Sequence, residues 1–236
     1  MNKNRVFTEK ELLELGRRTV DLICEAVDVG DKEKAKKLSH RMYREFQYMH
    51  DLLRDWVTAT LSYIYERYGD EAVYEAMHQG CSSWYKPIVE LYEKADSFRD
   101  RVQMLAMGLR GHLQPMKVEE DDEKVCITMV PCGSGERLFK EGGYSPPKNF
   151  SIIEKPQPCT YNRPNCPIYC AHEPMLEILS TEWKDHPTWV CFPPDGFATG
   201  GCCFCIYKDP KTIPEGVYAR VGKQKPKVWE SSAFSQ

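Results

Sequence analysis

Apolar residues in the first half of the chain recur at spacings of three and four, which is the period of an amphipathic α-helix. The first such stripe follows Thr8, which together with Glu11 has the form of a capping box, and it predicts a helix over residues 9–29 that stops at Gly30. The same period predicts four further helices, over about residues 31–69, 70–80, 82–92 and 97–113.

The pattern changes at Lys117. The acidic run at 119–123 predicts a solvated connector, because like charges repel one another and resist packing. Residues 125–130 then have the β-branched character of a strand, which a turn containing Cys132 ends. Beyond that turn the pattern predicts a short strand at 150–153, a helix from Ala171 to His186, paired strands at 188–192 and 202–207, and a short helix at 214–221.

These elements predict an α+β fold, in which a helical N-terminal half packs on a small antiparallel sheet in a cysteine-rich C-terminal half. The helical region is expected over residues 1–116 and the cysteine-rich α/β metal-binding region over residues 117–236. A chain of 236 residues can bury a substantial core, so we expect the two regions to form one integrated unit.

Charge and hydropathy argue against nucleic acid and membrane as partners. The formal charge of -3 and a pI near 6.1 provide no overall basic surface, so nucleic acid is not expected as a partner. The polar N-terminus carries no signal-peptide hydrophobic region, and no apolar run approaches the roughly 20 residues needed to span a bilayer. We therefore expect a cytoplasmic protein without a membrane partner.

The chain contains 11 cysteines, which in a cytosolic protein of this size favour reduced thiols over disulfides. Cys24 and Cys81 stand alone in helical patterns and are expected in the core. The others fall between Cys126 and Cys205, and we expect at least four of them to share a metal ion.

Zinc takes four ligands, preferably thiolate and imidazole, from short local pairs and turns. Cys170 and His172 lie together at a predicted helix start, and Cys132 lies on a glycine turn. Cys191 and Cys202 lie on adjacent predicted strands and complete a candidate set that can converge at one end of the sheet. Three protein ligands would leave an open, catalytic position, whereas four thiolates would make the site structural. An iron–sulfur cluster is the alternative cofactor, although the spacing of Cys159, Cys166 and Cys170 matches no ferredoxin.

Proton transfer beside such a metal would need a titratable group. His172 and Glu173 adjoin the candidate ligand Cys170. His50 lies next to Asp51 among aromatic and apolar residues of the long predicted helix, where it could face a ligand cavity or be a partly buried, hydrogen-bonded histidine. We expect His50, His172 and Glu173 to be the catalytic candidates.

The segment from Cys170 to Tyr207 resembles the C-terminal core of the 4-vinyl-reductase-type ligand-binding domains, and the related L-2-amino-thiazoline-4-carboxylate hydrolase-like proteins look similar there. In zinc-containing members of the first group, the metal ligands correspond by position to Cys170, Cys191 and Cys202. The family's Glu falls on Thr188, so Cys132 or His172 would complete the set. The resemblance implies several helices on an antiparallel sheet, with a small organic ligand between them.

These observations favour a zinc-dependent hydrolase or lyase that acts on a small organic molecule, working as a homodimer through its helical face. A zinc-containing small-molecule-binding or redox-sensing module is the first alternative, in which Cys132 and the group Cys202, Cys203 and Cys205 exchange thiols or release metal on oxidation. An iron–sulfur protein is the second alternative.

Overall fold

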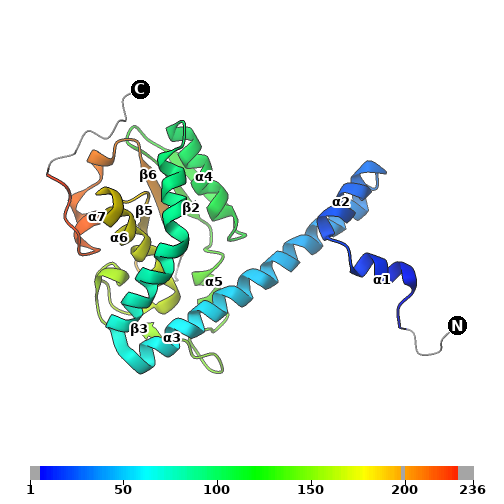
Figure 1. The fold of residues 1–236 in the computed structure, drawn as a ribbon, viewed down its shortest axis with the longest axis horizontal. Helices are drawn as coiled ribbons and strands as arrows, with labels where there is room; N and C mark the ends of the chain where they lie inside the picture. The colour runs from blue at the N-terminus through cyan, green and yellow to red at the C-terminus, as the bar shows by residue number, and fades with distance from the viewer. Residues whose placement is uncertain (1–5, 198–199, 228–236) are drawn as a thin grey trace. The chain divides into compact units, whose positions relative to one another are not determined.

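The computed structural model describes residues 6–197 and 200–227 (Figure 1). Its helices are mostly N-terminal and its antiparallel sheet is C-terminal, which confirms the predicted α+β class. The chain divides into two compact units, Met1–Leu53 and Arg54–Gln236, and the long helix α3 (Lys32–Glu93) contributes to both. The predicted change of region near Lys117 corresponds to the passage from helices to strands, whereas the division into units falls inside α3.

The first unit contains two short helices where one was predicted. Thr8 forms the predicted capping box with Glu11, but α1 (Glu9–Leu15) ends at Gly16. α2 (Thr19–Asp28) then begins after a break of three residues. A helical stripe of apolar residues continues across this break, so periodicity alone does not reveal it; glycine, a poor helix former, marks the position.

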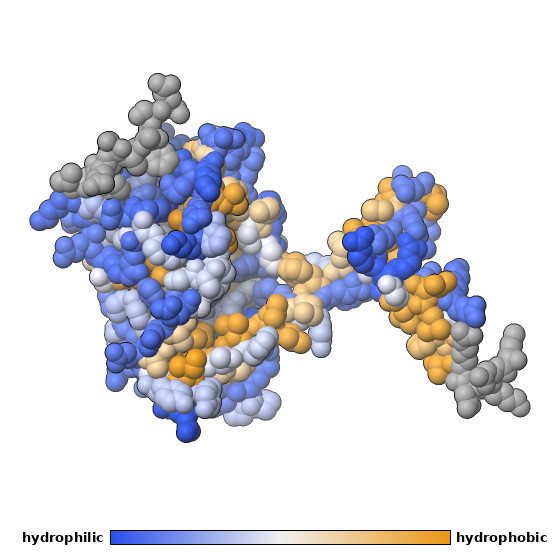
Figure 2. Space-filling model, viewed as in Figure 1, coloured by the Kyte–Doolittle hydropathy of each residue, from blue (hydrophilic) through white to orange (hydrophobic). Residues whose placement is uncertain are grey.

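Little apolar surface is buried within this first unit. α1 has no buried residue, and the core of the unit consists of Leu22, Ala26 and Leu38 with partly buried neighbours. Large apolar side chains of α1 and α2 are exposed and form orange surface in Figure 2. A core this small does not supply the free energy that a domain needs to fold alone.

In the second unit α3 bends at Gly69, whose φ of 82° lies in the region of positive φ that favours glycine. The predicted break there is confirmed, but the predicted end near Gly80 is wrong, because the helix continues through Pro87 to Glu93. The continuous helix buries one stripe at three- and four-residue spacing, made of Val73, Met77, Cys81, Tyr85, Val89 and Tyr92.

The acidic run is part of the sheet and not a connector, which corrects the sequence prediction. β1 (Met116–Glu120) pairs antiparallel with β2 (Lys124–Met129), and only a tight turn at Asp121 joins them. β1 is an edge strand whose side chains are mostly exposed. Its carboxylates can therefore stay in water while its backbone pairs, and charged edge strands also resist pairing with other chains.

The sheet has the order β1-β2-β6-β5, and all its pairs are antiparallel. β5 (Val190–Phe192) and β6 (Cys203–Tyr207) form the pair that the sequence predicted. Because side chains alternate along a strand, Phe204 and Ile206 face one side of the sheet, and Cys203 and Cys205 face the other.

Each face of the sheet packs on different elements of the second unit (Figure 1). α3, α4 (Phe98–Arg110) and α6 (His172–Lys184) pack against the face that carries Phe204 and form the main core with it. The opposite face packs on Ile213 and on α7 (Glu215–Ala219). The predicted C-terminal helices near 171–186 and 214–221 are thus present with slightly shorter bounds.

The remaining elements are short. α5 (Gly135–Lys140) follows the Cys132 turn and was not predicted, while β3 (Ile152–Ile153) pairs with β4 (Cys166–Pro167). Three 3-10 turns complete the described elements: η1 (Pro158–Thr160), η2 (Ile168–Ala171) and η3 (Pro210–Thr212). Among helices of the described residues, none combines the length and apolar character needed to cross a lipid bilayer.

Candidate functional site

A cavity in the second unit lies between the sheet, the start of α6 and the turn before α5. The volume of this cavity that water can enter is about 40 Å³. A water needs roughly 10–15 Å³ of such space, so the cavity holds about three waters, or an ion with a small ligand. Six residues that the sequence singled out line it: Cys132, Cys170, His172, Glu173, Cys191 and Cys202.

The Cys132 turn reaches the cavity because Gly133 lets it pack closely against the end of α4. A Cβ atom on Gly133 would lie 1.9 Å from the carbonyl oxygen of His112, so any other residue would displace the turn. The backbone N–H of Cys132 donates to the buried carboxylate of Glu136 at 2.9 Å. Burial raises the pKa of the Cys132 thiol, which favours its neutral form.

Cys170 lies in η2, immediately before α6. Its sulfur packs against Gly135, where an added Cβ would lie 2.8 Å from Sγ. Burial raises the pKa of Cys170 well above its usual value, and the nearby thiols of Cys166 and Cys202 raise it further. In the absence of a cation, this thiol is therefore neutral.

Cys191 and Cys202 enter the cavity from the sheet. Their side chains are hydrogen-bonded to one another, and the pKa of Cys191 is raised well above its usual value, first by burial and then by this contact. Gly201 allows Cys202 to approach β2, because a Cβ there would lie 1.5 Å from the carbonyl oxygen of Met129. The Met129 N–H in turn donates to the Cys202 carbonyl at 3.0 Å.

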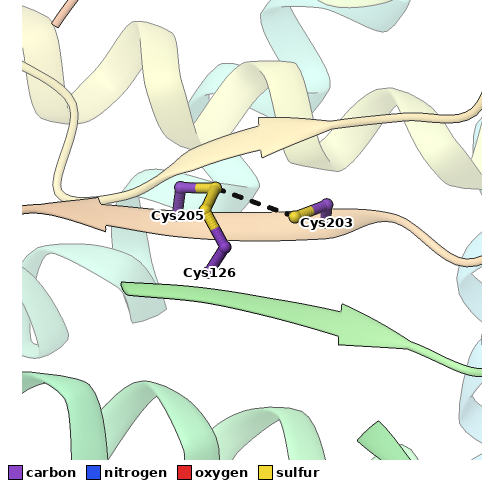
Figure 3. Close-up of side chains that lie close together, drawn as sticks. All are labelled: Cys126, Cys203 and Cys205. Atoms are coloured by element: carbon purple, nitrogen blue, oxygen red, sulfur yellow. Dashed lines mark hydrogen bonds between the residues drawn. A yellow bond between two sulfur atoms is a disulfide. The ribbon is translucent and has the colours of Figure 1, made fainter. Parts of the chain in front are cut away.

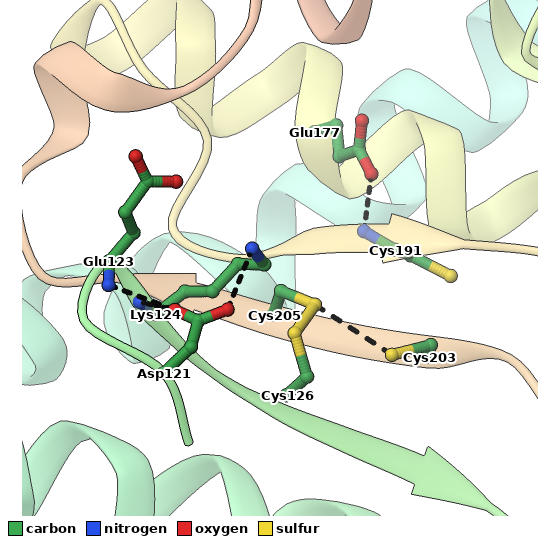
Figure 4. Close-up of a disulfide and its surroundings, with 8 residues drawn as sticks. All are labelled: Asp121, Glu123, Lys124, Cys126, Glu177, Cys191, Cys203 and Cys205. Atoms are coloured by element: carbon green, nitrogen blue, oxygen red, sulfur yellow. Dashed lines mark hydrogen bonds and ion pairs between the residues drawn. A yellow bond between two sulfur atoms is a disulfide. The ribbon is translucent and has the colours of Figure 1, made fainter. Parts of the chain in front are cut away.

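A buried ion pair that sequence reasoning missed holds the backbone of Cys191. The Cys191 N–H donates to Glu177 at 2.7 Å (Figure 4), and Arg220 donates to the Cys191 carbonyl at 2.8 Å. Arg220 also binds both oxygens of Glu177, and the Tyr161 hydroxyl donates to the same carboxylate at 3.1 Å. Burial raises the pKa of Glu177 to about 7, although Arg220 opposes this shift. The only hint in the sequence is a glutamate inside an otherwise apolar stretch of helix.

Both ring nitrogens of His172 are occupied in this conformation. Nδ1 lies 2.5 Å from the carbonyl oxygen of Tyr169, and Nε2 lies 3.0 Å from the carboxylate of Glu173. Burial lowers the pKa of His172, but Glu173 and the Tyr169 carbonyl outweigh it and the net direction is upward. His172 can therefore become a metal ligand only if one of these contacts breaks.

The second carboxylate oxygen of Glu173, Oε2, is buried without a hydrogen-bond partner. An unsatisfied buried carboxylate oxygen costs on the order of 1–3 kcal/mol and calls for a physical reason. Glu173 lines the cavity beside Cys170 and Cys191, so a cation or a hydrogen-bond donor held there would satisfy this oxygen.

A second group of sulfur atoms lies on the opposite face of the sheet. Cys126, Cys203 and Cys205 bring their sulfur atoms within 4.8 Å of one another and could hold a metal ion (Figure 3). Within residues 6–197 and 200–227, no other group of three His, Cys, Asp or Glu ligand atoms is this close. The cavity thiols are therefore more widely spaced than a bound metal would require.

Cys126 and Cys205 form a disulfide, which corrects the expectation that the cysteines are all reduced. The prediction that Cys202 forms one group with Cys203 and Cys205 relied on their proximity in the sequence, and it is wrong. Strand alternation sends Cys202 to the cavity and the other two to the far face. Cys81 is buried as predicted, but Cys24 is exposed and was wrongly assigned to the core.

His50 belongs to the first unit, whereas the cavity is built from residues of the second unit. Its Nδ1 atom lies 3.0 Å from the carboxylate of Asp51, the neighbour that the sequence suggested. The catalytic role of His50 remains a prediction.

Comparison of the chain with protein-family models, with curated proteins and with solved structures found no match. The resemblance to 4-vinyl-reductase-type domains therefore remains an expectation.

Proposed function

We propose that the cavity binds a thiophilic metal ion, with zinc as the first candidate, through three or four of the thiolates of Cys132, Cys170, Cys191 and Cys202. One observation carries this proposal. Residue type and spacing predict these residues as ligands, and although they come from separate segments of the chain, they all line one cavity. A disulfide is absent among them, so their sulfur atoms are free to coordinate.

The electrostatics of the cavity suit a cation. Burial disfavours thiolates at Cys132, Cys170 and Cys191, but a divalent ion inverts this preference and displaces their protons. The unpartnered oxygen of Glu173 supplies a further anionic group in the same place. Because the sulfur atoms are more widely spaced than in a closed site, binding requires changes of cysteine rotamer that draw them together.

Catalysis is the finer part of the proposal. A zinc ion held by three protein ligands is a Lewis acid with one open position, which suits a hydrolase or lyase. The paired side chains of His172 and Glu173 could hold and move a proton beside it. With about 40 Å³ available, the substrate is a small organic molecule unless the cavity opens.

A redox-sensing module is the second candidate function, and the Cys126–Cys205 disulfide favours it. A disulfide beside a free cysteine responds to the thiol–disulfide balance of its surroundings. An iron–sulfur protein is a weaker candidate, because the thiols that line the cavity include neither Cys159 nor Cys166. Absorption of the purified protein distinguishes it, since an iron–sulfur cluster makes the protein brown.

Cobalt(II) substitution tests the cavity site. We expect the protein with its Cys126–Cys205 disulfide intact to bind cobalt with the intense near-ultraviolet absorption of thiolate coordination, and Cys170→Ser and Cys191→Ser to weaken that absorption and the affinity at least tenfold. Cys24→Ser is the matched control. Because Cys24 is exposed and lies outside the cavity, this variant should leave the absorption and the affinity unchanged. Full cobalt affinity in both cavity variants would refute the site.

A small anion titrated into the cobalt form separates catalytic from structural metal. An open position predicts a change in the cobalt spectrum as the anion coordinates. A closed site with four sulfur ligands predicts no response, and would move the function to the binding or sensing module.

A further inference from the structure

We propose that Cys126, Cys203 and Cys205 form a second metal site, which exists only while the Cys126–Cys205 disulfide is reduced. The ligand is a thiophilic d10 ion, Cu(I) or Zn²⁺, and oxidation of the pair to the disulfide expels it. This proposal is independent of the cavity site, which uses other cysteines on the other face of the sheet.

Strand register places the three thiols together. Cys126 on β2 lies directly opposite Cys205 on β6, with their Cα atoms 4.1 Å apart. Cys203 lies two residues earlier on β6, so it faces the same side of the sheet as Cys205. Figure 3 shows the three side chains gathered at this place on neighbouring strands. The backbone of a regular sheet holds them, and no loop has to close around the metal.

The sulfur spacing fits a metal of this kind. The Sγ atoms of Cys203 and Cys205 are 3.7 Å apart. Two thiolates on a tetrahedral zinc ion with Zn–S distances of about 2.3 Å are separated by about 3.8 Å. When the disulfide is reduced, the sulfur of Cys126 separates from that of Cys205 to non-bonded contact, and the three atoms then form a triangle with edges near this length.

The surroundings give small reagents a route to the sulfur atoms. Cys205 is buried against Val190 and Tyr207, whereas Cys126 and Cys203 are only partly buried. Figure 4 shows Cys203 and Cys205 on β6, between Cys126 on β2 and Cys191 on β5. A low-molecular-weight thiol can therefore reach the disulfide from the solvent-exposed edge of the group.

The chemistry is a two-electron exchange. One low-molecular-weight thiolate attacks the disulfide, and the mixed disulfide is released when a second thiol molecule attacks it. Cys126 and Cys205 become thiols, and the two reagent molecules leave as their own disulfide. Binding of the ion then releases one proton from each thiol ligand. In the reverse direction, a low-molecular-weight disulfide accepts the two electrons, Cys126 and Cys205 rejoin, and the ion loses two of its three ligands.

Metal stoichiometry in the two redox states tests the proposal. The protein is prepared with the disulfide intact or reduced under anaerobic conditions, and each form is titrated with Zn²⁺ or Cu(I) against a competing chelator. We expect the reduced form to bind one equivalent more than the disulfide form. Of Zn²⁺ and Cu(I), the preferred ion is the one that the reduced protein still binds when a stronger chelator competes for it.

Variants assign that extra equivalent. Cys203→Ser and Cys203→Ala keep the disulfide partners, and each should abolish the difference between the redox states. Cys24→Ser should preserve the difference, and Cys191→Ser should lower metal binding equally in both states. Equal stoichiometry in the reduced and disulfide forms, or an unchanged difference in both Cys203 variants, would overturn the proposal whatever happens at the cavity.

Discussion

Glu177 is a single carboxylate that accepts hydrogen bonds from three groups beside Cys191, which lines the cavity. It accepts from Arg220, from Tyr161 and from the backbone N–H of Cys191, and it is almost fully buried. Buried ions of this kind are tolerated when their partners satisfy them, and removal of one partner leaves an uncompensated charge. The Glu177–Arg220 ion pair thus holds the backbone of Cys191 in place, at the position on β5 from which this residue lines the cavity.

We expect Glu177→Gln to destabilise the protein by about 3 kcal/mol, because Arg220 would lose its buried counter-charge. Urea unfolding of the metal-free protein measures the change. Glu182→Gln, on the same helix, is the matched control: Glu182 makes partly exposed pairs with Lys223 and His78, so it should cost below about 1 kcal/mol. Equal losses in the two variants would contradict the role assigned to Glu177.

His186 predicts a pH dependence of stability. Burial lowers its pKa to about 4, and Lys184 and Arg101 act in the same direction while Glu93 opposes them. The unfolded value is about 6.5, so the unfolded chain takes up a proton that the folded protein refuses. The stability contributed by His186 is therefore fully present above about pH 6.5 and is lost as the pH drops towards 4, by on the order of 3 kcal/mol.

Chemical unfolding between pH 4 and pH 7 measures this slope. His186→Asn should lose less stability than the wild type as the pH falls from 7 to 4, since the variant has no group to protonate at that position. Parallel curves for the two proteins would show that His186 does not contribute.

Residue type and spacing predicted the thiols of the cavity, because clustered cysteines are rare unless they have a chemical use. Glu177 and Arg220 could not be found in that way. The apolar neighbours of Glu177 hint that it is buried but do not name its partner, and Arg220 lies 43 positions further along the chain. Their pairing follows from tertiary packing, which periodicity does not encode.

Gly201 controls how β6 joins the sheet. A Cβ at this position would overlap the Met129 carbonyl, whereas a Cβ on the neighbouring Gly200 would meet only Pro194, at an ordinary 3.6 Å. We expect Gly201→Ala to displace Cys202 and β2, and to cost at least about 2 kcal/mol in the free energy of unfolding. Gly200→Ala should be within about 0.5 kcal/mol of the wild type. Similar unfolding free energies for the two variants would contradict the close packing at Gly201.

The secondary-structure predictions succeeded where one face of an element is buried. The stripes of α3 and α6 and the pairing of β5 with β6 follow the hydrophobic pattern. β1 was missed because its stability comes from backbone pairing with β2, while its charged side chains stay exposed. The break at Gly16 and the continuation through Gly80 show that glycine alone does not decide where a helix ends.

The sheet separates two kinds of sulfur chemistry within the second unit. Thiols on one face line a cavity with His172 and Glu173, and the disulfide with Cys203 lies on the other face. Sequence order could not predict this division, because adjacent residues such as Cys202 and Cys203 belong to different faces. This separation would allow the proposed cavity site and the proposed redox-responsive group to act independently in one small sheet.

Self-association is expected through the first unit, whose own core is small. Met42, Phe46, Met49 and Leu53 follow one another at spacings of four, three and four on α3, and each is between 42% and 50% exposed. That spacing forms a seam suited to a second helix of the same kind, so a second copy of the chain is the expected partner.

We predict that the double variant Phe46→Glu and Met49→Glu is monomeric while the wild type is dimeric, as measured by light scattering over a range of concentrations. Arg44→Glu lies off the seam on the same helix and should leave the dimer intact. A monomeric wild type, or a dimer that survives the double variant, would contradict the expected seam.

The sulfur count around bound zinc tests the proposed cavity site most directly. Zinc K-edge X-ray absorption would be recorded on reduced Cys203→Ser protein with one equivalent of zinc, so that the group on the opposite face does not contribute. Coordination by Cys132, Cys170, Cys191 and Cys202 predicts three or four sulfur atoms at about 2.3 Å, and one fewer in Cys191→Ser. Zinc surrounded only by nitrogen and oxygen, or an unchanged sulfur count in Cys191→Ser, would contradict metal binding by these thiols.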